Sequence, residues 1–142
     1  MPAGLFSDAW AVAWAAEINA SAAYRAAGAR WESAFVLVME ADPTLGVPAQ
    51  RGVYVDLARG ECRTGRAAVA DDLERAGYVL RAPAAVWKRV LGGDLEPVGA
   101  VMVGLMELSR GSLISLAPHI PAAKQLLLAA ARVETAFPEG WA

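Results

Sequence analysis

Hydrophobic and polar residues alternate along the chain with two different periods, which predict helices in some segments and strands in others. In the first apolar segment, Trp10, Trp14 and Ile18 recur every four residues, as on one face of a helix. We therefore predict a helix over residues 8–27 that ends before Gly28, because glycine commonly terminates helices. Alanine covers much of its remaining surface, so this helix can pack closely on more than one side.

Two segments have the period of two that is typical of strands. Both alternating faces of residues 31–40 are apolar, so we expect this strand to be covered on both sides. In residues 53–57, apolar side chains alternate cleanly with polar ones. A turn at residues 58–60 leads into a short polar strand near Cys62. The spacing of these segments indicates an antiparallel meander rather than βαβ units.

The second half of the chain alternates between predicted strands and helices. In chain order these are a strand at residues 78–82, a helix at 83–91, a short helix between Asp94 and Gly104, a strand at 105–109 and a helix at 121–134. We expect Asp94 to cap the short helix. Residues 70–77 fit either a helical turn or an edge connection.

Composition adds a surplus of apolar residues to this pattern. The chain has 142 residues, and we expect residues 1–142 to form one domain. Hydrophobic residues make up 56% of the sequence, above the usual ~45–50%. The surplus predicts a core, a ligand cavity or an interface with a partner.

The charge and the cysteine content limit the kinds of partner and the cellular compartment that we expect. The net charge is −2 with both signs interspersed, so we do not expect nucleic acid as a partner. The apolar N-terminal segment lacks a basic start, and no apolar run reaches ~18 residues, so we expect neither a signal peptide nor a transmembrane helix. The one cysteine, Cys62, excludes an internal disulfide and fits a cytoplasmic protein.

Few residues could support catalysis. The one histidine, His119, has no evident partner for a nucleophile system, and a single histidine excludes two-histidine metal motifs. The glycines at residues 92–93 are typical of a helix end rather than of a phosphate loop. We therefore assign no catalytic residue, metal or cofactor. Glu17, Ser21 and Tyr24 could form a polar site, but we favour a buried hydrogen-bond cluster between helices.

A series of motifs in the second half of the chain has a characteristic order. Trp87 is followed by Leu-Gly-Gly-Asp-Leu-Glu-Pro at residues 91–97, by Ala100, and by Gly-Leu-Met-Glu-Leu at residues 104–108. This order resembles the sterol carrier protein-2 (SCP2) family of lipid-binding domains. The order of the predicted elements is similar to that family along nearly all of the chain.

The sequence departs from the family pattern at three positions. Glu96 stands where the family often has aspartate, Met106 replaces a common leucine, and Gly111 falls one residue later than usual. In the first helix, the motif Asn-x-Ser-x-x-Tyr that begins at Asn19, together with the later Trp31, resembles a bacterial stand-alone subgroup.

The resemblance implies an α+β fold with a five-stranded, mostly antiparallel sheet, helices over one face, and a hydrophobic tunnel between them. The ligand would be a fatty acid, an acyl-CoA, a phospholipid or a sterol-like lipid, bound without catalysis. Ordinary core packing is the competing interpretation for any single apolar residue. The candidate tunnel residues are Val86, Val90, Leu91, Val98, Val101, Met102, Leu105, Met106, Leu113, Leu116, Leu126, Leu127 and Ala130.

Two further hypotheses concern contacts outside the tunnel. Lys88 and Arg89 are candidates for binding a charged head group, although adjacent residues on a helix cannot point the same way. The chain could instead be an interaction or dimerisation module that serves a lipid- or small-molecule-metabolising enzyme, or that forms a homodimer. In that case Leu128, Phe137 and Trp141 would cover the partner, and Leu128 is also a candidate for transient membrane contact.

Overall fold

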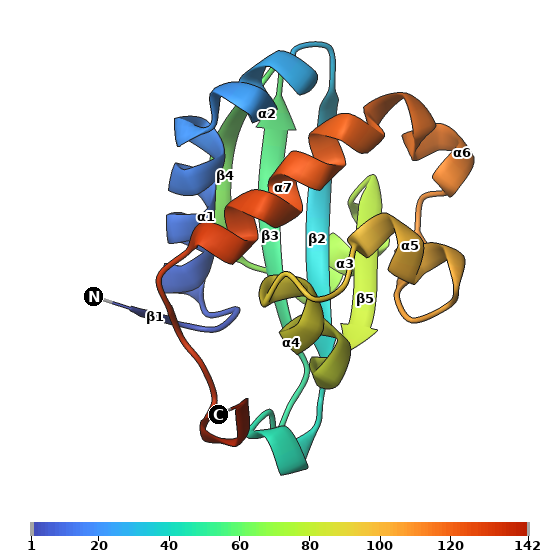
Figure 1. Cartoon of the computed structure of the whole chain (residues 1–142). Coiled ribbons are helices and arrows are strands. Elements are labelled where there is room, and N and C mark those ends of the chain that lie inside the picture. The colour runs from blue at the N-terminus through green and yellow to red at the C-terminus, as the bar shows by residue number, and fades with distance from the viewer. Residues whose placement is uncertain (1, 142) are drawn as a thin grey trace.

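A five-stranded mixed sheet forms the centre of the computed structural model, which describes residues 2–141 (Figure 1). Its strands are β2 (Glu32–Glu40), β3 (Arg51–Ala58), β4 (Glu61–Ala67), β5 (Tyr78–Pro83) and β6 (Glu107–Arg110). They lie side by side in the order β4-β3-β2-β5-β6. The predicted α+β fold with five mostly antiparallel strands is confirmed.

Six helices cover the face of the sheet on which the main core lies, and α7 crosses in front of β3 and β2 (Figure 1). These helices are α1 (Asp8–Ala20), α2 (Ala22–Ala27), α4 (Ala84–Leu91), α5 (Pro97–Met102), α6 (Leu113–Leu116) and α7 (Ile120–Arg132). The terminal segments pair through the two-residue parallel strands β1 (Ala3–Gly4) and β7 (Thr135–Ala136). Short 3₁₀ turns are η1 (Pro43–Leu45), η2 (Ala117–His119) and η3 (Glu139–Trp141).

The strands β2, β3 and β4 form the predicted antiparallel meander. On β3, Val53, Val55 and Leu57 are fully buried, as their alternation predicts. Arg59 and Gly60 make the turn to β4 with positive φ angles of 52° and 85°, a combination suited to a two-residue hairpin.

The strand β5 lies outside the predicted meander and runs parallel to β2. The chain leaves β4 at one edge of the sheet and returns on the far side of β2. Local alternation of apolar residues does not specify which strand a later strand will pair with, so the sequence pattern could not reveal this crossover. The last strand, β6, pairs antiparallel with β5 and completes the sheet.

The connection from β4 to β5 contains a short helix, α3 (Ala70–Arg75), so the segment that the sequence leaves undecided is helical. Leu73 and Ala76 pack here against Val36 and Val38, on the face of β2 opposite to the main core. The strand is therefore covered on both sides, as its two apolar faces predict. This one short helix lies on the face opposite to the other helices.

Asp72 holds α3 in place. Its carboxylate accepts two hydrogen bonds from the Arg66 guanidinium, at 2.7 and 3.0 Å, and one from the backbone N–H of Val69 at 2.7 Å. The Arg66 guanidinium lowers the pKa of Asp72 below its ordinary value. The arrangement ties the start of the helix to β4 and has a structural role.

Two helix boundaries differ from the sequence prediction. The first predicted helix is broken at Ser21, whose hydroxyl accepts from the backbone N–H of Tyr24 and so starts a second helix. The cap of α5 is Glu96 rather than Asp94, because the Glu96 carboxylate accepts from the backbone N–H of Gly99. Asp94 lies outside the helix.

Tryptophan side chains fill the core on the α1 side of the molecule. Trp10, Trp14 and Trp87 are fully buried, as the four-residue spacing of the first two predicts. Each indole N–H has a partner: Trp14 donates to the carbonyl of Leu126, and Trp87 to the carbonyl of Val38, both at 2.9 Å. Buried indoles with satisfied N–H groups fix the relative positions of α1, α7 and the sheet.

The helical run Leu113–Arg132 is long and apolar enough, by length and composition, to cross a membrane, which the sequence analysis does not anticipate. The core helices of soluble proteins share this length and apolar composition. Ala122, Leu126 and Ala129 are fully buried inside this chain, so we interpret α7 as a core helix.

Candidate functional site

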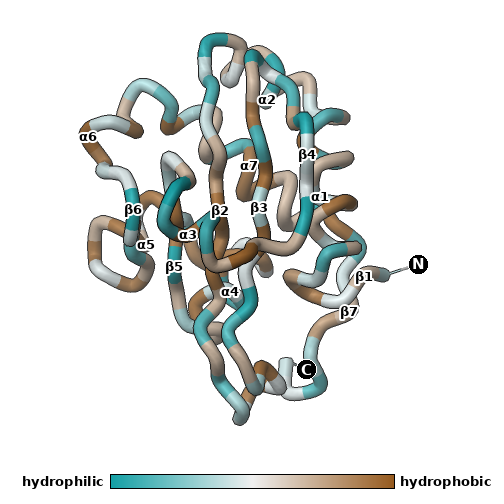
Figure 2. The backbone as a smooth tube through the Cα atoms, turned by 180° about the vertical axis from the view of Figure 1, so that it is seen from behind, coloured by the Kyte–Doolittle hydropathy of each residue, from teal (hydrophilic) through white to brown (hydrophobic). Residues whose placement is uncertain are grey.

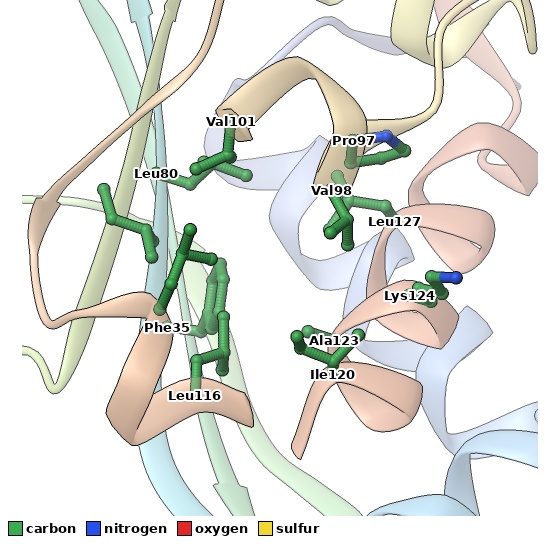
Figure 3. Close-up of a pocket in the computed structure, with 12 residues that line it drawn as sticks. Phe35, Leu80, Pro97, Val98, Val101, Leu116, Ile120, Ala123, Lys124 and Leu127 are labelled. Atoms are coloured by element: carbon green, nitrogen blue, oxygen red, sulfur yellow. The ribbon is translucent and has the colours of Figure 1, made fainter. Parts of the chain in front are cut away.

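An apolar pocket lies between the sheet and the helices α5, α6 and α7 (Figure 3). Its volume is about 30 Å³, enough for a water molecule or two and too small for an acyl chain. We call it the apolar pocket. The residues that line it are Phe35, Leu80, Pro97, Val98, Val101, Leu108, Leu113, Leu116, Ile120, Ala123, Lys124 and Leu127.

The wall of the pocket on α7 follows from helix geometry. Ala123, Lys124 and Leu127 follow Ile120 by three, four and seven residues, so the four side chains lie toward one side of the helix. The sheet side of the pocket consists of Phe35 on β2, Leu80 on β5 and Leu108 on β6. The registers of these neighbouring strands place the three side chains on one face. The helices α5 and α6 border the pocket with valine and leucine side chains, and Figure 3 shows Val98 and Val101 of α5 in the upper part of the view and Leu116 of α6 in the lower part.

A groove of about 530 Å³ adjoins the pocket between α7 and the loop that precedes α5. We call it the α7 groove. It shares Pro97, Lys124 and Leu127 with the apolar pocket, so the two spaces meet at these side chains. Its lining is Val90, Gly93, Asp94, Leu95, Glu96, Pro97, Lys124, Leu127, Leu128 and Ala131.

A second, more open groove of about 650 Å³ lies between α5, β6 and α6. We call it the α6 groove. It shares Val101, Leu108 and Leu113 with the apolar pocket. Its lining is Val101, Gly104, Met106, Glu107, Leu108, Gly111, Ser112, Leu113 and Ile114. The apolar pocket is therefore flanked by a groove on each side, and we call these three neighbouring, largely apolar spaces the path.

Exposed hydrophobic side chains gather around the α6 groove. Met102 is 73% exposed, Val103 is 72% exposed, and Ile114 is 88% exposed. Figure 2 shows the backbone tube in hydrophobic colours along α6 and the loop between α5 and β6. Such a concentration of exposed apolar residues is typical of a contact surface.

Charged groups lie at the edges of this path. The Lys124 ammonium lies 3.8 Å from the Glu96 carboxylate, and Arg89 pairs with Asp94 at 3.3 Å. Lys124 is the only charged side chain among the described residues that line the apolar pocket.

Five of the candidate tunnel residues line the pocket, and two others line a groove. The first group is Val98, Val101, Leu113, Leu116 and Leu127. The second is Val90 in the α7 groove and Met106 in the α6 groove. Val86, Leu91, Met102, Leu105, Leu126 and Ala130 are outside these three linings. Lys88 and Arg89 lie on the exposed surface of α4, also outside them.

The positions of these residues on their helices explain why some candidate residues line the pocket and others do not. Leu126 and Ala130 are buried on a different side of α7, where the Leu126 carbonyl accepts from Trp14. Met102 and Leu105 come at or after the end of the short helix α5 and are exposed.

Sequence reasoning missed the pocket residues contributed by the sheet, Phe35, Leu80 and Leu108, because an inward strand residue looks like ordinary core. It also missed Lys124, which belongs to the polar arc of the last helix. The three- and four-residue spacing of Ile120, Ala123 and Leu127 is the signal that could have grouped the α7 wall.

The side chains that the sequence analysis considered for catalysis have contacts typical of a structural role. His119 stacks on Trp31 with ring centroids 5.2 Å apart. Cys62 is buried, and burial raises the pKa of its thiol to about 11, which disfavours a reactive thiolate. No group of three or more metal-ligating side chains is found among the residues that the structure describes.

The polar strip on the first helix is not one cluster. The Glu17 carboxylate pairs with Arg132 at 3.5 Å, and Ser21 caps α2. The Tyr24 hydroxyl is buried without a hydrogen-bond partner, and burial raises its pKa to about 12. The expected buried hydrogen-bond cluster is therefore wrong for these three residues.

The structure is an α+β domain with a small apolar pocket between its sheet and its helices. Comparison with solved structures agrees. A crystal structure of sterol carrier protein 2 is 40% identical, with a TM-score of 0.82, over 91% of this chain and 98% of that chain. The solution structure of a conserved hypothetical protein from Thermus thermophilus, titled as possibly a sterol carrier protein, is 37% identical, with a TM-score of 0.81, over 99% of both chains.

The chain belongs to the sterol carrier protein 2 family, as its motifs predict. No family model and no curated protein sequence matches it.

Proposed function

We propose that this chain is a non-catalytic carrier that binds the hydrocarbon part of a lipid in the apolar pocket. The main observation that supports this proposal is the lining of the apolar pocket. It consists of apolar side chains from the sheet and from three helices, with one lysine at its edge. The names of the two solved relatives, a sterol carrier protein 2 and a possible sterol carrier protein, support the same class of ligand.

The pocket has to widen when the ligand enters, because its volume of about 30 Å³ holds no acyl chain. Burial of each methylene contributes about 0.8 kcal/mol, so a chain of eight methylenes gains roughly 6 kcal/mol toward this opening. The helices α5 and α6 are the parts suited to move, because they have only six and four residues. One hydrogen bond of 2.9 Å, between the Tyr78 and Ser115 hydroxyls, joins α6 to β5.

Exchange of the ligand with a membrane fits the surface around the α6 groove. Met102, Val103 and Ile114 extend exposed side chains beside this end of the path. Their transient insertion into a bilayer surface would place the opening next to the lipid chains. The free thiol of Cys62 fits a reducing compartment, and we propose the cytoplasm.

Native mass spectrometry of the freshly purified protein, followed by solvent extraction, tests the proposal directly. We expect adducts that extract as fatty acids, acyl-CoA, phospholipids or other lipids. A clean mass for the free chain, together with no measurable binding of added fatty acid, would contradict a carrier role.

The same sample distinguishes the interaction module. Leu128 and Phe137 are 53% and 51% exposed, which suits a partner surface, whereas Trp141 is buried under the Phe137 ring. A stable homodimer in light scattering, without bound lipid, would favour that function.

A further inference from the structure

The position of Lys124 relates the apolar pocket to the α7 groove. It lines both the apolar pocket and the α7 groove, so it stands where the two spaces meet. Figure 3 shows the Lys124 side chain at the border of the pocket, with its nitrogen turned away from the enclosed centre. The alkyl stem is thus part of the apolar wall while the ammonium group faces the outer end, as amphipathic lysine side chains commonly do.

The partner of this ammonium group is held by a second interaction. One oxygen of Glu96 lies 3.8 Å from the Lys124 nitrogen, and the other accepts the capping hydrogen bond from Gly99. The two side chains of the ion pair are 51% and 53% exposed. Ion pairs at such exposure contribute little to stability, so a competing carboxylate can replace Glu96 at small cost.

The other charged side chains that line the α7 groove are acidic, so Lys124 is the cation of this lining. Asp94 and Glu96 are the acidic residues of the lining, and Asp94 is paired with Arg89 from α4. Lys124 is the only basic side chain among the described residues that line this groove. An anionic group in the groove therefore has one favourable contact, with a side chain that the groove shares with the apolar pocket.

We propose that Lys124 binds the ionised carboxylate of a fatty acid whose chain extends into the apolar pocket, and that Glu96 occupies the lysine until the ligand arrives. This proposal rests on the proposed carrier function and adds to it the orientation of the bound fatty acid. The carboxylate end lies in the α7 groove, and the hydrocarbon end points toward the α6 groove. Exchange of one carboxylate for another leaves the charge at the lysine balanced, so chain burial supplies most of the affinity.

Calorimetric titration with dodecanoate and with its methyl ester separates the head group from the chain. The decisive variant is Lys124→Met, which keeps an apolar stem in the wall and removes the charge. We expect Lys124→Met to bind dodecanoate about five-fold more weakly, in the range of a partly exposed ion pair, and to bind the ester unchanged. Lys124→Arg should retain the preference for the acid.

Two further variants sharpen the test. Glu96→Gln should bind dodecanoate about two- to three-fold more tightly, because the lysine loses its competitor. Lys88→Met removes the other lysine of the chain, which is exposed on α4 and lines neither space, and should leave both affinities unchanged. A loss of acid preference in Lys88→Met instead would assign the head group to α4 and overturn the proposal.

The outcomes separate this inference from the carrier function. Equal weakening of acid and ester in Lys124→Met, or no weakening of either, would contradict the head-group site while leaving the carrier function intact. Failure of the unaltered chain to bind both ligands would contradict the carrier function itself, and the head-group site with it.

Discussion

Helix α7 takes part in two regions of the molecule that are packed in opposite ways. Toward α1, Leu126 lies among Trp10 and Trp14, and all three side chains are fully buried. Toward α5 and α6, Lys124 and Leu127 face a space of about 30 Å³ that lies next to two grooves. One side of the helix is thus part of a filled core, while the other borders a space that can expand.

The difference shows how a small domain can combine stability with an adaptable pocket. The tryptophan side is made from a helix of 13 residues, α1, whose buried indoles are hydrogen-bonded to fixed partners. The pocket side is covered by helices of six and four residues, with partly exposed side chains. We infer that the first region maintains the fold while the second can rearrange around a ligand.

The largest expected effect is on the stability of the tryptophan side. Trp14→Ala removes a fully buried indole and its hydrogen bond to Leu126, and should lower the free energy of unfolding by about 3–5 kcal/mol. Val98→Ala, on the pocket side, should cost about 1 kcal/mol, because this valine is only partly buried. Urea unfolding measures both values. Similar losses for the two variants would contradict the proposed division of the core.

A smaller effect is expected on ligand transfer. Replacing Met102 and Ile114 together by serine should slow transfer of a fluorescent fatty acid to vesicles about five-fold, because about 1 kcal/mol of apolar contact with the bilayer is lost. The affinity in solution should stay the same. Val12 and Val69 are 55% and 57% exposed and line neither the pocket nor its grooves, so their double serine variant is the control. Equal slowing in both double variants would argue against a specific contact surface.

The smallest expected effect is that of alkaline pH on stability, through Cys62 in the main core. The folded chain holds the Cys62 proton up to a pKa of about 11, whereas the unfolded thiol releases it near 9.0. The unfolded state therefore binds fewer protons between these values, and stability should fall as the pH rises from 9 toward 11. Urea unfolding at pH 8 and pH 10 checks the slope, which should be shallower in Cys62→Ala. Rapid alkylation of the native thiol at pH 8 would show that this region is open.

Local patterns in the sequence predicted much of the fold. The alternation around Val55 and the spacing of Trp10 and Trp14 placed these residues correctly, because each pattern reports burial of one face. The break at Ser21 depends on one side-chain hydrogen bond, and the parallel pairing of β5 depends on contacts between distant segments. Neither the break nor the parallel pairing produces a periodic pattern of apolar residues in the sequence.

The site was predictable only in part, for a related reason. Val98, Val101 and Leu127 combine apolar character with a position near the family motifs, and they line the pocket. Phe35 lies on a central strand, 63 positions before Val98 and 92 positions before Leu127, and only the tertiary fold brings it to the same space.

The most direct test of the central claim is to fill the apolar pocket. Ala123 lines it, whereas Ala85 is exposed on α4, so Ala123→Phe and Ala85→Phe add the same group inside and outside the pocket. Calorimetric titration with dodecanoate should show at least about ten-fold weaker binding for Ala123→Phe, since roughly 1.4 kcal/mol or more of chain burial is lost, and unchanged binding for Ala85→Phe. Equal affinities in two folded variants would contradict the placement of the acyl chain beneath α5 and α6.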